Sequence, residues 1–399
     1  MKKDRDVVIV GACRTAIGKF GGSLKDLRAY QLAGIAMDES LRRAGTDKGQ
    51  LDEVIAGECL QNPDESNTAR TAALSIDIPV EVPAYTVMKA CNSSMQALAN
   101  GRAQIEVGDA EMVLVAGMES MSNGQYVLKN ARWGQRLMHG EMTDAVWEIL
   151  HAGTGFLGDK YIMGETAERI AEKFAISREE QDAFALRSHN SAEAAIEAGK
   201  FKDEIVAVIQ EGKKVTQTFD TDEHLRLRLT MEELAMLKPA FRKNGTVTAG
   251  NSSGLNDGAS AAVITSRTRA KELGLKPLAR IVAQTVAGVP PEIMGYGPVP
   301  AIRKLLEKTG MRLEQIGLFE INEAFASQFL VCEKELGLDR NKVNVNGGGI
   351  ALGHPVGCTG LRIVISLLYE MKRRNEQYGI ASLCAGGGMG MATLIELEG

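Results

Sequence analysis

Three side chains in this sequence combine reactive chemistry with a constrained position: Cys91, His354 and Cys384. Cys91 lies between a short apolar stretch and a helical run, where a thiol faces unpaired backbone N–H groups and the positive end of the helix dipole. Both features favour the thiolate, which is a strong nucleophile at neutral pH. Free cysteine is also among the most buried residue types, so a plain core position for Cys91 stays open.

His354 stands between Gly353 and Pro355 in a glycine-rich stretch. A histidine within reach of a cysteine is the usual means of generating a thiolate. The glycines at 347–349 do not indicate a nucleotide phosphate loop, because no Gly-Lys-Ser or Gly-Lys-Thr follows them. A buried histidine with satisfied hydrogen bonds is the alternative for this loop taken alone.

Two apolar strands are followed by further polar groups. Asn322 and Glu323 come after one of them, and Cys384 ends another, just before the glycines at 386–388. Polar side chains at strand ends are typical site positions in α/β folds. Turn and cap residues would look the same if each stretch stood alone.

Regular elements must position these residues. The sequence predicts a strand over 82–88 and a helix after Cys91, in which Met95, Leu98 and Ile105 recur at helical spacing. Ser177 and Glu180 form a capping box. The other predicted elements are strands over 7–10, 51–56, 112–117 and 261–265, and helices over 27–43, 166–174 and 178–198.

The chain contains a weak internal repeat. A helical run ends at Gly45, 46 residues before Cys91, and another ends at Gly310, 44 residues before His354. The repeat predicts two related α/β halves, with an insertion in the first half. A twofold-like pairing would place the turns of Cys91 and His354 at matching ends of two central helices. Any α/β protein can show such coincidences, so the pattern is suggestive only.

Bulk composition excludes several classes. The 399 residues carry a net charge of −5, which argues against nucleic-acid and membrane-surface binding. The six cysteines form no CxxC pair and no metal-ligand spacing with the five histidines. We therefore expect no metal, no membrane segment, free thiols and a cytoplasmic location.

Five motifs taken together resemble the thiolase family of acetyl-CoA acetyltransferases and 3-ketoacyl-CoA thiolases. They are the Cys91 turn, residues 250–259, Asn322-Glu323-Ala324-Phe325, Gly353-His354-Pro355 and the run from Cys384 to Gly388. The resemblance implies an α/β fold of five layers, αβαβα, made of two similar halves. It implies an N-terminal half at 1–118 plus 253–275, an inserted loop domain at 119–252 and a C-terminal half at 276–399.

The resemblance also implies roles for the site residues. Cys91 would be the nucleophile, His354 its base, and Cys384 the acid and base for the second substrate. Asn322 would hold a water that forms one oxyanion hole with His354. The backbone N–H groups of Cys91 and Gly386 would form the other.

Coenzyme A is expected as substrate and product, with no tightly bound cofactor. The expected contacts with CoA and the acyl chain are Arg226, Ser253, Leu237, Phe241, Ala249 and Met163. The basic run from Arg226 to Lys243, in isolation a solvated face, would then serve the phosphates of CoA. The resemblance further implies a homodimer or homotetramer active in fatty-acid metabolism.

The expected reaction is acetyl transfer through an acetyl-Cys91 intermediate, either condensation of two acetyl-CoA molecules or thiolysis of a 3-ketoacyl-CoA. The sequence departs from the family pattern at Tyr161-Ile162, where acetoacetyl-specific members often have histidine before the Met163 segment. A β-oxidation thiolase with longer-chain preference is thus an alternative, and a non-catalytic acyl-CoA or lipid carrier is a remote one. Asn92-Ser93-Ser94 replaces a more usual Gly-Ser-Gly run, and Cys358 is expected to be a packing residue.

Overall fold

The computed structural model describes residues 5–151, 161–211 and 216–398. The remaining residues, 1–4, 152–160, 212–215 and 399, include both chain ends and parts of the predicted inserted domain, and those parts of the prediction lie outside the described residues. The domain boundaries stay a prediction.

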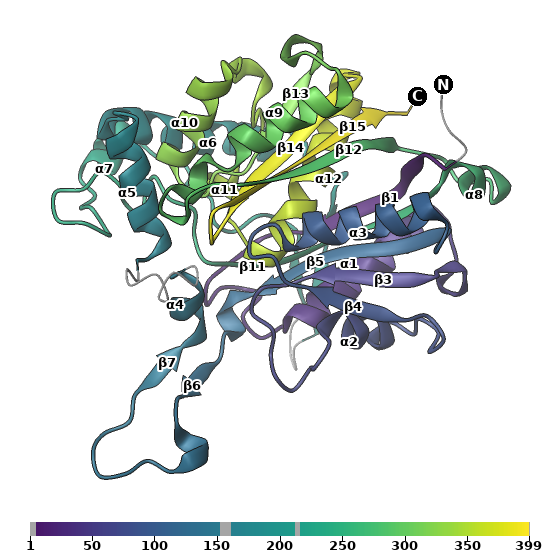
Figure 1. The fold of residues 1–399 in the computed structure, drawn as a ribbon, viewed down its shortest axis with the longest axis horizontal. Coiled ribbons are helices and arrows are strands. Elements are labelled where there is room, and N and C mark those ends of the chain that lie inside the picture. The colour runs from purple at the N-terminus through teal and green to yellow at the C-terminus, as the bar shows by residue number, and fades with distance from the viewer. Residues whose placement is uncertain (1–4, 152–160, 212–215, 399) are drawn as a thin grey trace.

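The strands form two sets, one for each half of the chain (Figure 1). They meet where Val8 and Ile9 pair with Arg280 and Ala279. The first set has the order β1 (Val7–Thr15), β11 (Asn256–Ser266), β5 (Met112–Ser120), β3 (Glu53–Gly57) and β4 (Ala84–Val87), with β2 (Gly18–Lys19) on β11 and β8 (Ile205–Val206) on β1. The second has the order β12 (Ala279–Gly288), β15 (Met389–Leu397), β14 (Tyr378–Ala385) and β13 (Leu318–Ile321).

Helices complete five layers, as the resemblance implied. The central layer holds α3 (Ser93–Val107) and α12 (Val356–Arg374), and one apolar core surrounds them between the two sets of strands. A second core lies under α1 (Ala29–Ala44) and α2 (Thr68–Ser75), and a third under α9 (Pro298–Thr309) and α10 (Ala326–Leu336). The short helix α8 (Arg267–Glu272) follows β11, and the short helix α11 (Gly349–Leu352) precedes α12.

The internal repeat is confirmed in the backbone. Helix α1 ends at Gly45 with φ 70°, and α9 ends at Gly310 with φ 67°, both in the left-handed conformation that glycine adopts without strain. In each half a 3₁₀ turn follows, at 48–50 and at 313–315, and leads into the parallel strand β3 or β13. The turns carrying Cys91 and His354 precede α3 and α12, at matching ends of the two central helices.

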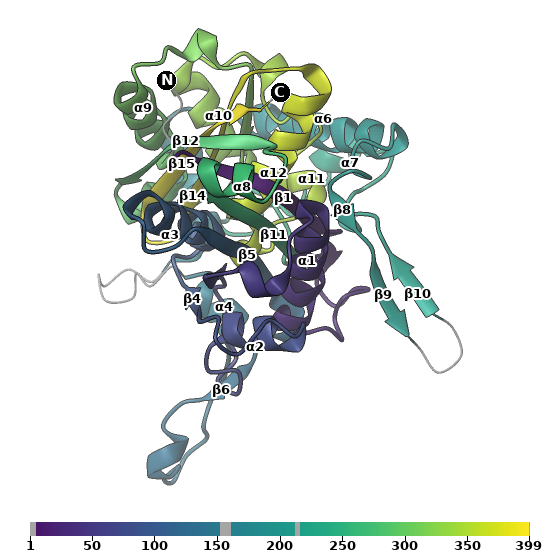
Figure 2. The same ribbon diagram turned by 90° about the vertical axis from the view of Figure 1, so that its right-hand side faces the viewer.

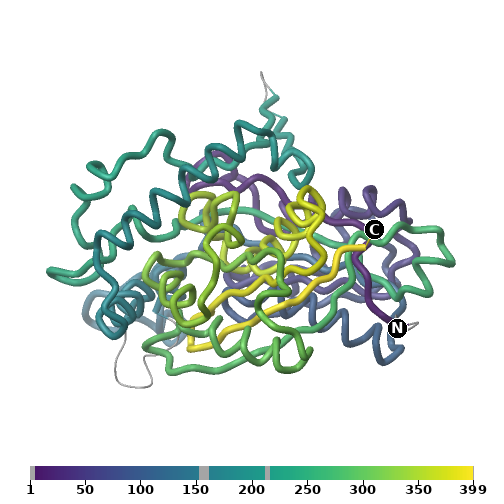
Figure 3. The backbone as a smooth tube through the Cα atoms, turned by 90° about the horizontal axis from the view of Figure 1, so that it is seen from above, coloured from purple at the N-terminus to yellow at the C-terminus, as the bar shows by residue number. Residues whose placement is uncertain are grey.

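The segment between β5 and β11 packs along one side of the C-terminal half, where Figure 3 shows it in teal. Its long helix α6 begins with the predicted capping box of Ser177 and Glu180. Two hairpins project from the body in Figures 1 and 2. The described strands and α-helices between β5 and β11 are β6 (Tyr126–Leu128), β7 (Met142–Asp144), α4 (Ala145–Ile149), α5 (Met163–Lys173), α6 (Arg178–Glu197), β8, β9 (Val208–Glu211), β10 (Thr216–Phe219) and α7 (Met231–Ala235).

Strand β1 is longer than the predicted strand over 7–10. It continues to Thr15 and carries the fully buried side chain of Arg14 into the protein interior. The Arg14 guanidinium donates to Glu204 and Asp222 at 2.6–2.9 Å, so its buried charge is compensated. Both carboxylates lie in the inserted segment, which ties this segment to the first half.

The central helices approach the sheet and each other with almost no side chain between them. A Cβ at Gly117 of β5 would lie 2.4 Å from Ser94 Cβ of α3 and 2.9 Å from Cys358 Cα of α12. A Cβ at Gly360 would lie 2.7 Å from the backbone nitrogen of Met95. Glycine at these positions is therefore a packing requirement, since only backbone fits in the space.

We expect Gly117→Ala to lower the free energy of unfolding by about 1–3 kcal/mol, because the added methyl overpacks the junction of α3, α12 and β5. Gly49→Ala is the matched control, since a Cβ at Gly49 meets no atom within 4 Å. Urea unfolding of both variants measures the difference. Equal midpoints for the two variants would show that the junction relaxes at no cost.

Candidate active site

The Cys91 turn has a strained backbone held by one hydroxyl. Ala90 has φ 48°, a conformation that side-chain-bearing residues rarely adopt. The Ser93 hydroxyl accepts a hydrogen bond from Lys89 N–H at 2.8 Å and donates one to the Ala90 carbonyl at 2.6 Å. Ser93 thus closes the turn that places Cys91 at the N-terminus of α3.

Cys91 is half-buried, and the expected preference for a thiolate is wrong for this structure. Burial raises the pKa of Cys91 to about 11 and outweighs the hydrogen bond from Gly386 N–H to its sulfur, which lowers it. The group is a neutral thiol at neutral pH, so it needs a base to become a nucleophile. Cys91 and Gly386, from different halves of the chain, are nevertheless brought together as predicted.

Cys384 is the last residue but one of strand β14 and is buried next to Cys91. Its pKa lies well above the usual value, first because of burial and second because a charge on Cys91 would repel a second thiolate. The two sulfurs therefore belong to one site. Within it, a proton leaves one of them far more easily when the other is neutral.

His354 is 5% exposed, and its ring orientation is set by Thr359. Nδ1 lies 2.7 Å from the Thr359 hydroxyl, which itself donates to the Pro355 carbonyl at 2.8 Å. Nδ1 must then carry the proton and donate it to Thr359, and Nε2 is left unprotonated, as an acceptor. Burial, with a smaller contribution from Arg362, lowers the pKa of His354 to about 3, so the ring is a neutral base.

Asn322 contacts the histidine. Its amide nitrogen lies 3.4 Å from Nε2 of His354, and its backbone N–H donates to the Ser382 carbonyl at 2.9 Å. Because β13 and β14 are parallel neighbours, Asn322 and Cys384 emerge at the same edge of the sheet. The Asn322 side-chain oxygen is buried without a hydrogen-bond partner among the described residues.

The expected CoA contacts lie on two connected loops. The guanidinium of Arg226 donates to the Ala249 carbonyl at 3.0 Å. The Ser253 hydroxyl and backbone N–H both donate to the Ala324 carbonyl at 3.0 Å, next to Asn322. Leu237 packs against Gly250, where a Cβ would lie 2.5 Å from its methyl group. The segment 251–256 connects these loops to the reactive residues, because its Asn256 side chain accepts a hydrogen bond from the His354 N–H at 2.9 Å.

Met163 and Phe241 form an apolar wall beside Cys384. Both pack on a buried cluster that includes Phe325 and Cys384, and the rings of Phe241 and Phe325 meet edge to face at 6.3 Å. Gly164 allows the approach, because a Cβ there would lie 2.3 Å from the Phe241 ring. An acyl chain next to Cys384 would meet apolar surface here.

Not every side chain of the basic run from Arg226 to Lys243 is available to bind a phosphate. Arg242 forms ion pairs with Glu165 and Glu172 of α5 and helps to anchor that helix. Lys238 and Lys243 are exposed. Cys358 is buried and donates to the Ser260 hydroxyl at 3.4 Å, as a packing residue would.

Sequence reasoning missed Thr359. A threonine in the first turn of a helix looks like an ordinary helix-start residue, and only the hydroxyl geometry reveals its contact with His354. Its spacing of five residues from the histidine was the available signal.

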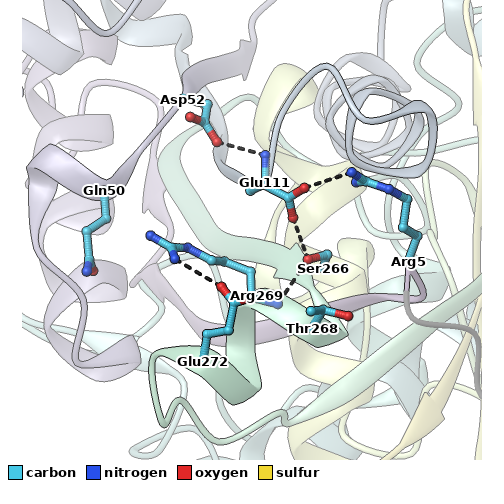
Figure 4. Close-up of a pocket in the computed structure, with 8 residues that line it drawn as sticks. All are labelled: Arg5, Gln50, Asp52, Glu111, Ser266, Thr268, Arg269 and Glu272. Atoms are coloured by element: carbon cyan, nitrogen blue, oxygen red, sulfur yellow. Dashed lines mark hydrogen bonds and ion pairs between the residues drawn. The ribbon is translucent and has the colours of Figure 1, made fainter.

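No group of three or more His, Cys, Asp or Glu side chains in the described ranges could hold a metal ion. No helix in that same part of the chain is long and apolar enough to cross a membrane. A pocket of about 450 Å³ lies away from the reactive residues, where Arg5 donates to Glu111 and Asp52 accepts from the Glu111 N–H (Figure 4). Because these polar groups satisfy one another, the pocket is a poor candidate for a catalytic site.

Two family descriptions match the chain almost end to end. Residues 7–268 match the thiolase N-terminal domain, and residues 275–397 match the thiolase C-terminal domain. The meeting point lies between β11 and β12, where the internal repeat begins again.

Relatives match over nearly their full length. The acetyl-CoA acetyltransferase of Syntrophomonas wolfei is 48% identical, with 98% of this chain and 99% of that protein covered. The crystal structure of the Bacillus anthracis acetyl-CoA acetyltransferase is 53% identical, with a TM-score of 0.96 and coverage of 98% and 99%. Human mitochondrial 3-ketoacyl-CoA thiolase in complex with CoA is 44% identical, with a TM-score of 0.94 and coverage of 99% and 98%.

We expect Thr359→Val to lower kcat at least about tenfold, with little change in KM, because the tautomer of His354 is no longer fixed and part of the ~10²–10⁴-fold contribution of a positioned base is lost. Thr359→Ser keeps the hydroxyl and should retain most of the activity. Steady-state cleavage of acetoacetyl-CoA by both variants measures the effect. If valine and serine behaved alike, the hydroxyl would have no part in orienting the ring.

Proposed function

The chain belongs to the thiolase family, and from this premise we propose that it is an acetyl-CoA acetyltransferase working through an acetyl-Cys91 intermediate. The observation that carries the proposal is the cluster at the N-terminus of α3, where Cys91 receives the Gly386 N–H and Cys384 lies beside it. The relatives named acetyl-CoA acetyltransferase, at 45–50% identity over the full length, support it.

The first half-reaction acylates Cys91. His354 Nε2 takes the thiol proton, and the Cys91 sulfur attacks the carbonyl carbon of an acyl-CoA. The N–H groups of Gly386 and Cys91 stabilise the oxyanion. The C–S bond to CoA breaks, and the CoA thiolate takes the proton of Cys384. Free CoA then leaves, and the site holds protonated His354, the Cys384 thiolate and the acyl group on Cys91.

The second half-reaction forms the carbon–carbon bond. The Cys384 thiolate removes a proton from the methyl group of a second acetyl-CoA, and Asn322, through a water, stabilises the enolate oxygen with His354. The enolate carbon attacks the acetyl carbonyl on Cys91. The Cys91 sulfur leaves and recovers its proton from His354, which closes the proton balance. Run in reverse with CoA, the same steps cleave a 3-ketoacyl-CoA.

A longer-chain 3-ketoacyl-CoA thiolase of fatty-acid metabolism is a second candidate. Ile162 stands where acetoacetyl-specific members often have histidine, and the wall of Met163, Phe241 and Phe325 beside Cys384 is apolar. Relatives named 3-ketoacyl-CoA thiolase and beta-ketothiolase match as fully as the acetyltransferases do. Cleavage rates for 3-ketoacyl-CoAs of increasing chain length separate the two.

We propose CoA and acyl-CoA as the ligands of the loops carrying Arg226 and Ser253, which a CoA-bound relative supports. The cytoplasmic location expected from the six unpaired cysteines belongs to the same proposal.

Two cysteine variants test the mechanism. With acetyl-CoA, the parent protein should gain an acetyl group on Cys91 by mass spectrometry, Cys91→Ser should gain almost none, and Cys384→Ser should still acylate but lose condensation and thiolysis. Activity should fall by at least ~10³-fold in Cys91→Ser, because the covalent path is closed. Normal CoA-ester binding without turnover in the parent would favour the carrier alternative. If Cys384→Ser failed to gain the acetyl group while Cys91→Ser still gained it, the roles of the two cysteines would be reversed.

The proposed assembly is a homodimer or homotetramer. Strand β4 pairs only with β3 among the described strands, so one backbone edge is open to a second copy. The β6–β7 hairpin stands clear of the body in Figure 1, and several of its apolar side chains are exposed. They are Tyr126, Trp133, Leu137, Met138 and Met142, exposed by 64–98%.

We expect light scattering to give a dimer or tetramer mass for the parent. Changing Leu137 and Met138 to aspartate should reduce a tetramer to a dimer, since the hairpin would no longer bury apolar surface. Val107→Lys, at another exposed apolar residue, should leave the mass unchanged. A monomeric parent would overturn the proposal.

A further inference from the structure

A fully buried carboxyl group joins the two catalytic turns. Glu119, near the end of β5, is 0% exposed. Its oxygens accept three backbone hydrogen bonds: from Cys59 N–H at 3.1 Å, Leu60 N–H at 3.1 Å and Gly357 N–H at 2.8 Å. Three N–H donors on one carboxyl group match a carboxylate, which only accepts.

The three donors come from both halves of the molecule. Cys59 and Leu60 follow β3, and the Cys59 sulfur lies 3.6 Å from the Ser93 hydroxyl that closes the Cys91 turn. Gly357 is in the first turn of α12, three residues after His354. Glu119 thus connects the nucleophile turn with the base turn, although it contacts neither reactive atom.

A second carboxyl group lies beside the first. Glu58 is 0% exposed, and its two oxygens have no close hydrogen-bond partner in the described part of the chain, although the Thr68 hydroxyl interacts weakly with the group. A Cβ at Gly357 would touch both Glu58 Cα, at 2.7 Å, and the Glu119 oxygen, at 2.9 Å. The Glu58 backbone and the Glu119 carboxyl group thus flank the same glycine, and the charge of Glu119 raises the pKa of the buried Glu58 carboxyl further, because like charges in a low-dielectric interior repel strongly.

The hydrogen bonds decide which group holds the charge. Glu119 has three N–H donors and Glu58 has no comparable donor, so Glu119 is the carboxylate and Glu58 keeps the proton. The pKa values run in the same order: burial raises that of Glu119 to about 7, whereas burial and the neighbouring Glu119 raise that of Glu58 to about 9. The other ionisable groups facing the pair are Arg28 and Glu65 on the side of Glu58, and Cys59, Cys91 and Cys358 on the side of Glu119.

We propose that Glu119 is a positioning residue of the proposed acyl-transfer reaction, holding the loop after β3 and the first turn of α12 in register as a carboxylate, while Glu58 serves as its protonated partner. The inference rests on the proposed function for its turnover readout only. Loss of the carboxylate lets the His354 and Cys91 turns drift relative to each other, and a misplacement of about 1 Å can cost on the order of 10²-fold in rate.

Glutamine variants of nearly the same shape distinguish the roles of the two glutamates. Glu58→Gln mimics a protonated carboxyl and should keep kcat within about twofold. Glu119→Gln turns an NH₂ group towards a backbone N–H, and kcat should fall at least about tenfold with KM for the CoA ester little changed. Burial is the main reason that the pKa of Cys91 is raised, and the negative charge of Glu119 adds to it. Iodoacetamide should therefore alkylate Cys91 faster in Glu119→Gln than in the parent, while turnover falls.

Opposite changes in turnover and alkylation in a Glu119→Gln protein that unfolds at the parent's temperature, with neither change in Glu58→Gln, support the proposal; a lowered unfolding temperature together with faster alkylation would indicate general loosening instead. Thermal unfolding and light scattering verify that each variant is folded. Equal loss in both variants, or full activity in Glu119→Gln, would overturn it. If no variant or parent cleaves any 3-ketoacyl-CoA, the proposed function fails, and the alkylation comparison still tests the charge on Glu119.

Two measurements avoid dependence on the folding of Glu119→Gln. Infrared spectra at neutral pH should show less protonated-carboxyl absorption in Glu58→Gln than in the parent; part of the band remains, because burial also raises the pKa of Glu320 to about 8. In the parent, kcat should fall as the pH drops through about 7, because protonation of Glu119 removes an acceptor, and His354, with a pKa of about 3, stays neutral there. An unchanged infrared band, or a kcat flat across this range, would contradict the assignment.

Discussion

The whole site depends on a contact from which side chains are almost absent. The N-terminal turns of α3 and α12 meet each other and the end of β5, and a Cβ at Gly117 or Gly360 would not fit between them. Gly57 at the end of β3 has the same role, since a Cβ there would lie 2.2 Å from Ser94 N. The Ser94 hydroxyl then bridges the helices, donating to the Cys358 carbonyl at 3.0 Å and accepting from Leu361 N–H at 2.9 Å. Two helix starts, one from each half of the chain, are thereby brought to one point.

That convergence has an electrostatic cost. Burial raises the pKa of Cys91 and lowers that of His354, which favours the neutral form of each group. The helix N-terminus and the Gly386 N–H oppose this but do not overcome it. In the proposed mechanism, the neutral thiol passes its proton to the neutral imidazole when charge develops on the substrate. The arrangement therefore suits a nucleophile that is formed during attack.

Local signals made much of the fold predictable, and distant contacts made the rest unpredictable. The left-handed caps at Gly45 and Gly310 and the capping box at Ser177 depend on neighbouring residues, so their patterns were readable in the sequence. Strand β1 was predicted too short because the partners of Arg14 lie 190 and 208 residues away. The five motifs placed Cys91, Cys384 and Gly386 together and Asn322 with His354. The neutral state of Cys91, the hydroxyl of Thr359 and the ion pairs of Arg242 follow from burial and orientation, which a sequence pattern does not encode.

Sulfur at both Cys91 and Cys384 fits a site that must circulate protons without importing charge. If the second base were a carboxylate, it would be permanently charged beside Cys91 and would oppose formation of the nucleophile. Burial raises the pKa of Cys384, so in the proposed mechanism this thiol is neutral until the departing CoA takes its proton, and it becomes a strong base only at the stage that needs one. The same logic separates Glu119 from the reacting atoms. Its charge is compensated by three backbone N–H groups and acts on the turns that carry the chemistry, where a fixed charge is useful, and the thiols keep the mobile protons.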